Sequence, residues 1–472
     1  MKEAFFLSQR LGFTNAQAET INRMGVEQFL KKSFETPFSM SEPTFLADAP
    51  RNRKEFREVR QMDDLTKKQL AVAERLRAVG IAHEWLKKMH TDDFPLREKM
   101  VLFWHNHFVS DLQKVKASWS MWQQNELFRR MAFGNYKELT RLILYDNAML
   151  GYLDNTQNKA KTPNENLSRE LLELFTLGVG NYTEGDIKEG ARALAGLNLG
   201  DGGGQYYRIW EDNGNKTYLG KTGNWKADDM VTIIFDHPKA GERLMTKFLK
   251  FFVSDEPKQA MIDDYTSTFR KANFEMRPML EKLVRDERFV KSQGWKIKDP
   301  TTFLLQLLYE FQLDVPPIRT SQPYFNGQGM KLLNPPNVKG WDGGKTWLSS
   351  QKLLQRTSVV ALLASGKPLE TLKVRRMKED AADEIGMTEE ALFGKDKGME
   401  KMPNLRWNKG LTNNKDIIKD LTDRLVFTVS PDLQAECERI LKYDFDAKAD
   451  NAPKSVTRLA EHIMKSPEFQ IY

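Results

Sequence analysis

Cysteine is almost absent from this chain of 472 residues, which contains only Cys437. A single cysteine excludes an intrachain disulfide bond and a zinc site built from cysteines. Cys437 falls in a helical pattern at Leu433–Leu441, so we expect it to be a small residue of the hydrophobic core.

Long apolar runs are missing as well. No stretch approaches the roughly 18 consecutive apolar residues of a membrane-spanning helix, so we expect no transmembrane segment. The first ten residues contain no sustained apolar segment, and no secretory signal is visible. This pattern fits a cytoplasmic protein and equally a mature chain whose leader has been removed.

Neither sign of charge is in large excess. The 72 basic and 65 acidic residues leave a net charge of +7. The basic residues do not cluster on one element and no module that reads DNA or RNA is recognisable, so we expect no nucleic-acid partner. The surplus is compatible with an anionic ligand, although a solvated surface of mixed charge explains it more simply.

Familiar catalytic motifs are also lacking, including those of zinc peptidases, serine hydrolases and dinucleotide-binding proteins. The segment Asn334–Trp347 contains Gly-Lys-Thr, but Lys339 stands where a phosphate-binding loop requires its first glycine. We therefore interpret this segment as a rigid loop. Its Asn337 and Trp341 either line a groove or fill the core.

Helical patterns dominate what is present, including long ones at Asp63–Met89 and Pro95–Phe108. The region 198–225 holds seven glycines between aromatic pieces, which predicts a β-hairpin or Gly-rich loop. The sequence thus predicts a mainly α fold, with residues 1–472 as a single large helical domain. A charged stretch at 367–415 is expected to be an exposed insertion.

The segment Thr162–Leu174 carries the densest group of polar side chains. Thr162 as N-cap, Pro163 at the first helical position and Glu165 three residues after the cap predict a helix that starts with a capping box. Glu165, Arg169 and Glu173 are four residues apart and share one face. A solvated ladder of ion pairs explains them as well as a site does, but the amides of Asn164 and Asn166 are not needed for such a ladder.

The pair His105 and His107 is the best source of imidazole. Side chains two positions apart on a regular helix point in directions that differ by about 200°. A regular helix therefore prevents His105 and His107 from binding one ion together. An unwound segment would allow it. The alternatives are hydrogen-bonded core histidines and a role in ligand binding or proton transfer.

These blocks together resemble a bacterial family, the domain of unknown function 1800. The resemblance rests on the residues around His105–Phe108, Asn164–Leu174, Tyr182–Gly196, Lys216–Gly220 and Asn334–Trp341, and it spans nearly the whole chain. Members often carry export signals and are frequently encoded beside a sulfatase-like family. The resemblance therefore implies a periplasmic or extracellular location and a sulfatase-like partner protein. Glu211 departs from the family pattern, which has a histidine at this place.

Two hypotheses follow. In the first, the protein is a metal-dependent enzyme of the cell envelope that acts on an anionic (sulfated, phosphorylated or carboxylated) small molecule or glycan. Its catalytic residues would be His105, His107, Arg169 and Glu170, with a divalent metal on His105, His107 and Glu170. Its ligand-binding residues would be Asn164, Glu165, Asn166, Glu173, Asp212, Lys216, Asn337 and Trp341. In the second, the protein is a non-catalytic binding or scaffolding protein that works with the sulfatase-like partner.

Overall fold

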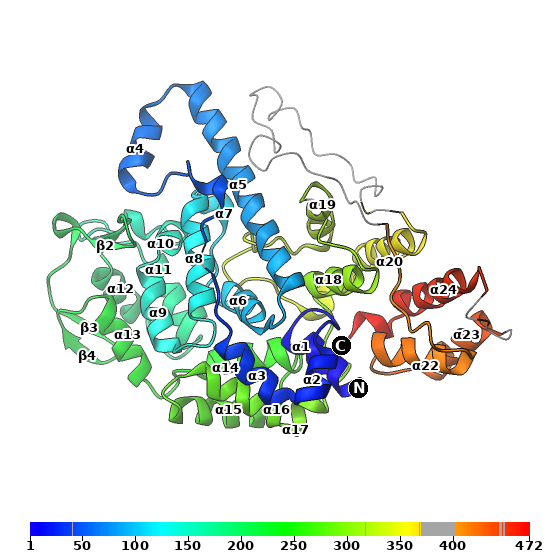
Figure 1. Cartoon of the computed structure of the whole chain (residues 1–472). Helices are drawn as coiled ribbons and strands as arrows, with labels where there is room; N and C mark the ends of the chain where they lie inside the picture. The colour runs from blue at the N-terminus through cyan, green and yellow to red at the C-terminus, as the bar shows by residue number, and fades with distance from the viewer. Residues whose placement is uncertain (40, 317, 368, 370–401, 443–445, 447–448) are drawn as a thin grey trace.

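Helices make up most of the computed structural model of this protein (Figure 1). The structure describes residues 1–39, 41–316, 318–367, 369, 402–442, 446 and 449–472. The predicted mainly α fold class is confirmed, since strands account for only a few of these residues. Of the predicted charged insertion at 367–415, residues 368 and 370–401 lie outside the described residues.

The amino-terminal half contains twelve α-helices in the described residues. They are α1 (Lys2–Leu11), α2 (Ala18–Met24), α3 (Val26–Glu35), α4 (Arg53–Gln61), α5 (Asp64–Thr91), α6 (Leu96–His107), α7 (Leu112–Val115), α8 (Ser118–Arg130), α9 (Tyr136–Leu144), α10 (Asn147–Tyr152), α11 (Asn166–Glu170) and α12 (Glu184–Ala193). Short 3-10 helices in this half are η1 (Thr44–Leu46) and η2 (Asn155–Gln157). A π-helical turn, η3 (Leu171–Thr176), continues α11 without a break.

The rest of the chain, after α12, adds eleven more α-helices among the described residues. They are α13 (Ala227–Asp236), α14 (Glu242–Phe252), α15 (Gln259–Lys271), α16 (Met276–Arg285), α17 (Glu287–Val290), α18 (Pro300–Glu310), α19 (Ile318–Gln328), α20 (Ser350–Ala364), α22 (Asn414–Leu425), α23 (Pro431–Ile440) and α24 (Ala452–Lys465). The 3-10 helices are η4 (Arg208–Trp210), η5 (Gly344–Leu348) and η8 (Glu468–Gln470). None of the described helices is long and apolar enough to cross a membrane.

Two small antiparallel sheets occupy the predicted Gly-rich region. One pairs β1 (Leu197–Asn198) with β2 (Gln205–Tyr206), and the other pairs β3 (Lys216–Tyr218) with β4 (Lys221–Gly223). The second is a hairpin with a two-residue loop, in which Leu219 and Gly220 both have positive φ, 47° and 78°. Positive φ at both loop residues matches the twist of the flanking strands. The predicted hairpin in this region is therefore confirmed.

Helix α6 lies in the centre of the molecule (Figure 1), and Asn106 is its only residue that is not buried. Its buried Glu98 accepts two hydrogen bonds from Arg129 of α8, at 2.6 and 2.7 Å. Breaking such a buried pair leaves a charge without compensation, which costs about 3–5 kcal/mol. This ion pair therefore fixes α6 against α8.

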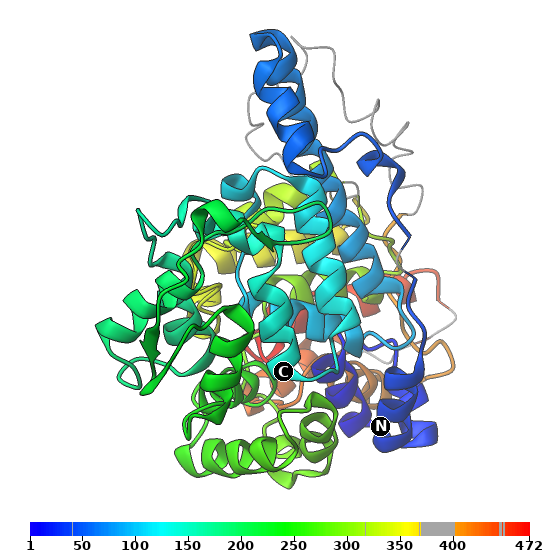
Figure 2. The same cartoon turned by 90° about the vertical axis from the view of Figure 1, so that its left-hand side faces the viewer.

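One continuous cluster of buried apolar residues surrounds α6 and extends from Ala4 to Tyr472. The two ends of the chain meet, because Arg10 of α1 donates a hydrogen bond of 2.7 Å to the carbonyl oxygen of Tyr472. Cys437 is fully buried in the same cluster, as the sequence predicted. Helix α4 and the first turns of α5 project beyond the rest of the body (Figure 2). The division of the chain into domains stays a prediction.

The predicted helix start at Thr162 is wrong. The helix α11 begins at Asn166, and Glu165 is its N-cap without a side-chain hydrogen bond. Thr162 instead pairs with Lys159 in an isolated β-bridge, and the amide of Asn164 donates to the Asn158 side chain at 3.0 Å. These tertiary bonds keep the segment out of the helix. A capping box does form further along the chain, where Thr183 caps α12 together with Asp186.

Two helices, α13 and α19, form against local sequence signals. The β-branched residues of α13 favour a strand by propensity, but its apolar face packs against α9 and makes it helical. Helix α19 contains Pro323, which would normally interrupt a helix.

Candidate functional site

A cavity of about 1060 Å³ opens beside the carboxy-terminal end of α6. Its walls are the last turn of α6, the residues that follow η3, one face of α14, and the segments 295–299 and 339–347. Helix α14 packs against both η3 and α6, so these three elements meet at one corner of the cavity. This corner contains the charged side chains that are of chemical interest.

The π-helical turn η3 shapes that corner. The carbonyl of Leu172 accepts hydrogen bonds from the amides of Leu177 and Gly178, at 3.0 and 2.9 Å, instead of from residue 176. The carbonyls of Leu174 and Phe175 bind side chains from other helices: Arg243 Nε donates to Leu174 at 2.9 Å, and Tyr136 donates to Phe175. Single π-helical turns occur frequently at functional sites.

His107 shares the carbonyl of Phe175 and lines the cavity. Its Nε2 lies 3.1 Å from that oxygen, which can only accept, so Nε2 carries the proton and Nδ1 has a free lone pair. Nδ1 is buried and has no hydrogen-bond partner among the described residues. Burial, followed by the nearby charges of Lys247 and Arg243, holds the pKa of His107 well below its usual value. The imidazole is therefore neutral at physiological pH.

Lys247 of α14 is the most unusual cation of the cavity. Its Nζ is buried and has no hydrogen-bond partner among the described residues. Burial, followed by the charge of Arg243, lowers the pKa of Lys247 to about 7. Near neutral pH a large fraction of this amine is therefore uncharged.

His105 lies apart from the cavity, in an aromatic environment. Its ring centroid lies 5.6 Å from that of Trp85 and 5.7 Å from that of Trp341. Burial lowers the pKa of His105 to about 3. Because α6 is regular through both histidines, they have different surroundings, and no group of three or more His, Cys, Asp or Glu in the described part of the chain could hold a metal ion. Metal binding by His105, His107 and Glu170 stays a prediction.

Arg169 and Glu165 lie on the surface. Arg169 forms ion pairs of 2.8 Å with Glu184 of α12 and 3.2 Å with Glu165, and about a third of its side chain is exposed. Pairs of this kind contribute only about 0–1 kcal/mol to stability. The guanidinium of Arg169 thus points to carboxylates at the surface rather than to either histidine. This geometry is that of a solvated ladder of ion pairs, one of the two explanations that the sequence left open.

Glu170 lies closer to the cavity. Burial and the neighbouring Glu173 raise the pKa of Glu170, while Arg169, Lys339 and Arg243 lower it. Two of these cations, Lys339 and Arg243, line the cavity. Glu173 itself accepts a hydrogen bond of 3.1 Å from the Tyr182 hydroxyl.

The two amides before α11 stabilise local turns. The side-chain oxygen of Asn164 accepts from the amide of Asn166 at 3.0 Å, which is an Asx turn. The side chain of Asn166 donates to Asp154 at 3.1 Å and is otherwise exposed. Both contacts fix the chain just before the helix start.

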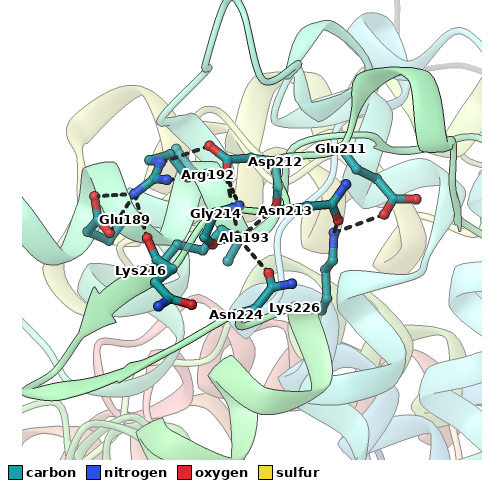
Figure 3. A network of polar contacts seen from close by, with 12 residues as sticks. Glu189, Arg192, Ala193, Glu211, Asp212, Asn213, Gly214, Lys216, Asn224 and Lys226 are labelled. Carbon is teal, nitrogen blue, oxygen red and sulfur yellow. Dashed lines mark hydrogen bonds and ion pairs between the residues drawn. The ribbon is translucent and has the colours of Figure 1, made fainter.

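Asp212 and Lys216 belong to a separate polar network around the β3 strand (Figure 3). Asp212 accepts two hydrogen bonds from Arg192, at 2.8 and 3.2 Å, and Arg192 also contacts Glu189. Lys216 Nζ donates to the carbonyls of Asp212 and Gly214 and to Asn224, at 2.7, 2.8 and 3.0 Å. Each charge already has close partners, so this network stabilises the loop before β3.

Glu211, where the resemblance led us to expect a histidine, forms an ion pair of 3.0 Å with Lys226 (Figure 3). Neither residue is among those that line the cavity. Glu211 therefore lies outside the corner around His107.

The loop 334–341 is attached to α6 through Asn106. Its oxygen accepts from the amide of Trp341 at 2.7 Å, and its nitrogen donates to the Trp341 carbonyl at 3.5 Å. Gly340 passes so close that a Cβ atom there would lie 2.1 Å from the Asn106 oxygen. Asn337 accepts from the Lys339 amide at 2.8 Å, an Asx turn that ends the loop. These contacts place Trp341 and Lys339 in the cavity wall.

A family model described as protein of unknown function (DUF1800) matches residues 7–471. The chain belongs to the DUF1800 family. This confirms the family that the sequence resembles. No curated protein and no solved structure matches the chain.

In this DUF1800 protein, sequence reasoning missed the two cations beside His107. Arg243 and Lys247 sit one turn apart in a helix whose sequence shows only ordinary amphipathic spacing. No motif distinguishes Lys247 from the exposed Lys250 three residues later. Of the predicted residues, His107 and Trp341 line the cavity and Glu170 lies within electrostatic reach of its cations. The roles predicted for the twelve residues stay predictions.

Proposed function

We propose that this DUF1800 protein is an enzyme that binds an anionic small molecule in the cavity beside η3, next to Arg243, Lys247 and His107. The observation that carries the proposal is the buried amine of Lys247, which has no partner among the described residues. Burying an unpaired ammonium is costly, so folds rarely retain one without a use for it. An anionic ligand would supply the missing partner.

The charges around Lys247 support an anion rather than a cation as the ligand. Arg243 is the only charged group that contributes to the lowered pKa of Lys247, and no described carboxylate offsets it. Arg243 is held at the wall by the carbonyl of Leu174, which leaves the rest of its guanidinium for a ligand. Lys339 adds a further positive charge to the cavity wall.

Proton transfer is the chemistry that this corner supports best. An anion next to Lys247 raises the pKa of the amine, so binding draws a proton onto Nζ. The free Nδ1 lone pair of His107 offers an acceptor in the same cavity. The corner can thus accept a proton from a substrate and bind the negative charge of the same substrate.

Calorimetric titration with sulfate tests the proposal, because sulfate does not itself titrate near neutral pH. Measurements at pH 7.5 in buffers of different ionisation enthalpy give the number of protons taken up. A Lys247 pKa of about 7 predicts uptake of up to about 0.8 proton per sulfate.

The variant Lys247→Met should abolish this uptake and weaken sulfate binding. Lys250→Met is the matched control, since Lys250 is an exposed lysine of the same helix that also lines the cavity. Absence of sulfate binding at millimolar concentration, or equal effects of the two variants, would contradict the proposal.

A further inference from the structure

Lys247 is only partly buried as a residue, but its Nζ is buried, and this amine differs from those of the buried lysines in its partners. Lys216 donates to three oxygens, Lys296 is paired with Asp255 at 2.7 Å, and Lys298 lies 3.7 Å from the centre of the Phe469 ring. Lys99 similarly lies 4.6 Å from the Phe13 ring. The fold thus stabilises each of these ammonium groups by a hydrogen bond, an ion pair or an aromatic face.

For Lys247 no hydrogen bond, ion pair or aromatic face is found among the described residues. Lys247 is one of the residues that line a cavity large enough for a small organic molecule. Its charged neighbour is Arg243, one helical turn earlier on the same face. A desolvated lysine next to another cation is the arrangement that activates an amine as a nucleophile.

We propose that Lys247 forms a covalent imine with the carbonyl group of an anionic oxo compound, of which 2-oxo acids are the simplest class. This rests on the proposed anion-binding function and specifies its substrate. Side chains at positions i and i+4 of a helix lie about 5–6 Å apart at Cβ. Arg243 can therefore hold the carboxylate while Lys247 Nζ reaches the adjacent carbonyl carbon.

The reaction is an ordinary condensation. The lone pair of neutral Nζ attacks the carbonyl carbon, the C=O π bond breaks, and one proton of Nζ passes to the oxygen to give a carbinolamine. Taking up one proton from solvent, the carbinolamine loses its hydroxyl as water and becomes the protonated imine. The positive charge of the imine neutralises the carboxylate of the bound compound. For the reaction to occur, the flexible lysine stem lets Nζ turn into the cavity.

Reductive trapping tests the inference on the full-length protein. The protein is incubated with pyruvate and cyanoborohydride at pH 7, digested, and the modified lysines are located by mass spectrometry. The trapped adduct carries the mass of pyruvate less one oxygen atom. We expect Lys247 to be modified at least about tenfold faster than Lys250, because a lowered pKa leaves far more neutral amine.

Two controls separate reactivity from folding. Urea-unfolded protein should lose the preference, and Lys247→Arg should show no adduct at residue 247 while its melting temperature reports on the fold. Acetone, which lacks a carboxylate, should modify Lys247 more slowly than pyruvate does. Equal modification of Lys247 and Lys250 in the native protein would overturn the imine. If sulfate still binds with proton uptake in that case, the anion-binding function survives and only the carbonyl chemistry fails.

Discussion

Replacing Gly340 by alanine should destabilise the protein by about 2–5 kcal/mol, through two separate effects. Gly340 has a φ of +89°, and a side chain in this left-handed region costs roughly 1–2 kcal/mol. The new Cβ atom would also lie 2.1 Å from the side-chain oxygen and 2.9 Å from the backbone oxygen of Asn106. Asn106 must then move, and the amide of Trp341 loses its acceptor, which costs about 1–3 kcal/mol for a buried donor.

Denaturant unfolding followed by tryptophan fluorescence measures the total loss in the free energy of unfolding of Gly340→Ala. Gly180→Ala is the matched control, because Gly180 has nearly the same φ, +87°, and nothing lies within 4 Å of the place that a Cβ atom would take. The control should lose only the backbone part, about 1–2 kcal/mol. If Gly340→Ala and Gly180→Ala differ by less than about 0.5 kcal/mol, the contact between Asn106 and the loop does not have the importance argued above.

Three further changes probe other contacts. Gly190→Ala places a Cβ 2.2 Å from the Ser168 hydroxyl, so unfolding measurements should show a loss of about 1–3 kcal/mol that Ser168→Ala partly restores. A double-mutant cycle of Arg169→Ala and Glu184→Ala should give a coupling below about 1 kcal/mol, because the pair is exposed, and a larger value would contradict the surface interpretation. The free energy of unfolding of the wild type should rise with pH between 7 and 10 because of Lys247. Lys247→Met should lack this rise, which is measured as the difference between the two proteins across that range.

The sign of that pH effect follows from proton binding. Burial lowers the pKa of Lys247 from 10.5 to about 7, so between these values the unfolded chain binds more protons than the folded protein. Stability contributed by this site therefore rises with pH through the window and is constant below it. The pKa of His107 lies well below its usual value, so His107 stays neutral across the same range and does not cancel the slope. An unchanged slope in Lys247→Met would show that the amine is not desolvated.

Much of the fold could be predicted because local signals and tertiary packing agree. The helical patterns predicted at Asp63–Met89 and Pro95–Phe108 coincide with α5 and α6. At Thr162 the local signal fails, because the Asn158 side chain and the bridge to Lys159 hold the backbone in another conformation. Such tertiary competition cannot be seen in a window of a few residues, and α13 fails for the same reason.

The candidate site could be predicted only where a motif marks it. His107 and Trp341 belong to recognisable blocks, and both line the cavity. Lys247 looks like any polar residue of an amphipathic helix, since its lowered pKa depends on what α6 and η3 place over it. The amides of Asn164 and Asn166 attracted attention for the opposite reason, because residues that fix turns are also conspicuously polar.

The π-helical turn connects the sequence pattern to the chemistry. The helix from Asn166 to Thr176 changes hydrogen-bonding pattern at Leu171 and ends at Thr176, so the carbonyls of Leu174 and Phe175, in its last turn, have no later amide of the helix to bind. In this protein those oxygens bind Arg243, His107 and Tyr136 instead. The bond to Phe175 sets the His107 tautomer, and the bond to Leu174 sets where the guanidinium lies beside Lys247. A change that continues the helix beyond Thr176 would occupy both carbonyls, and would therefore alter the tautomer of His107 and the pKa of Lys247 together, without touching either side chain.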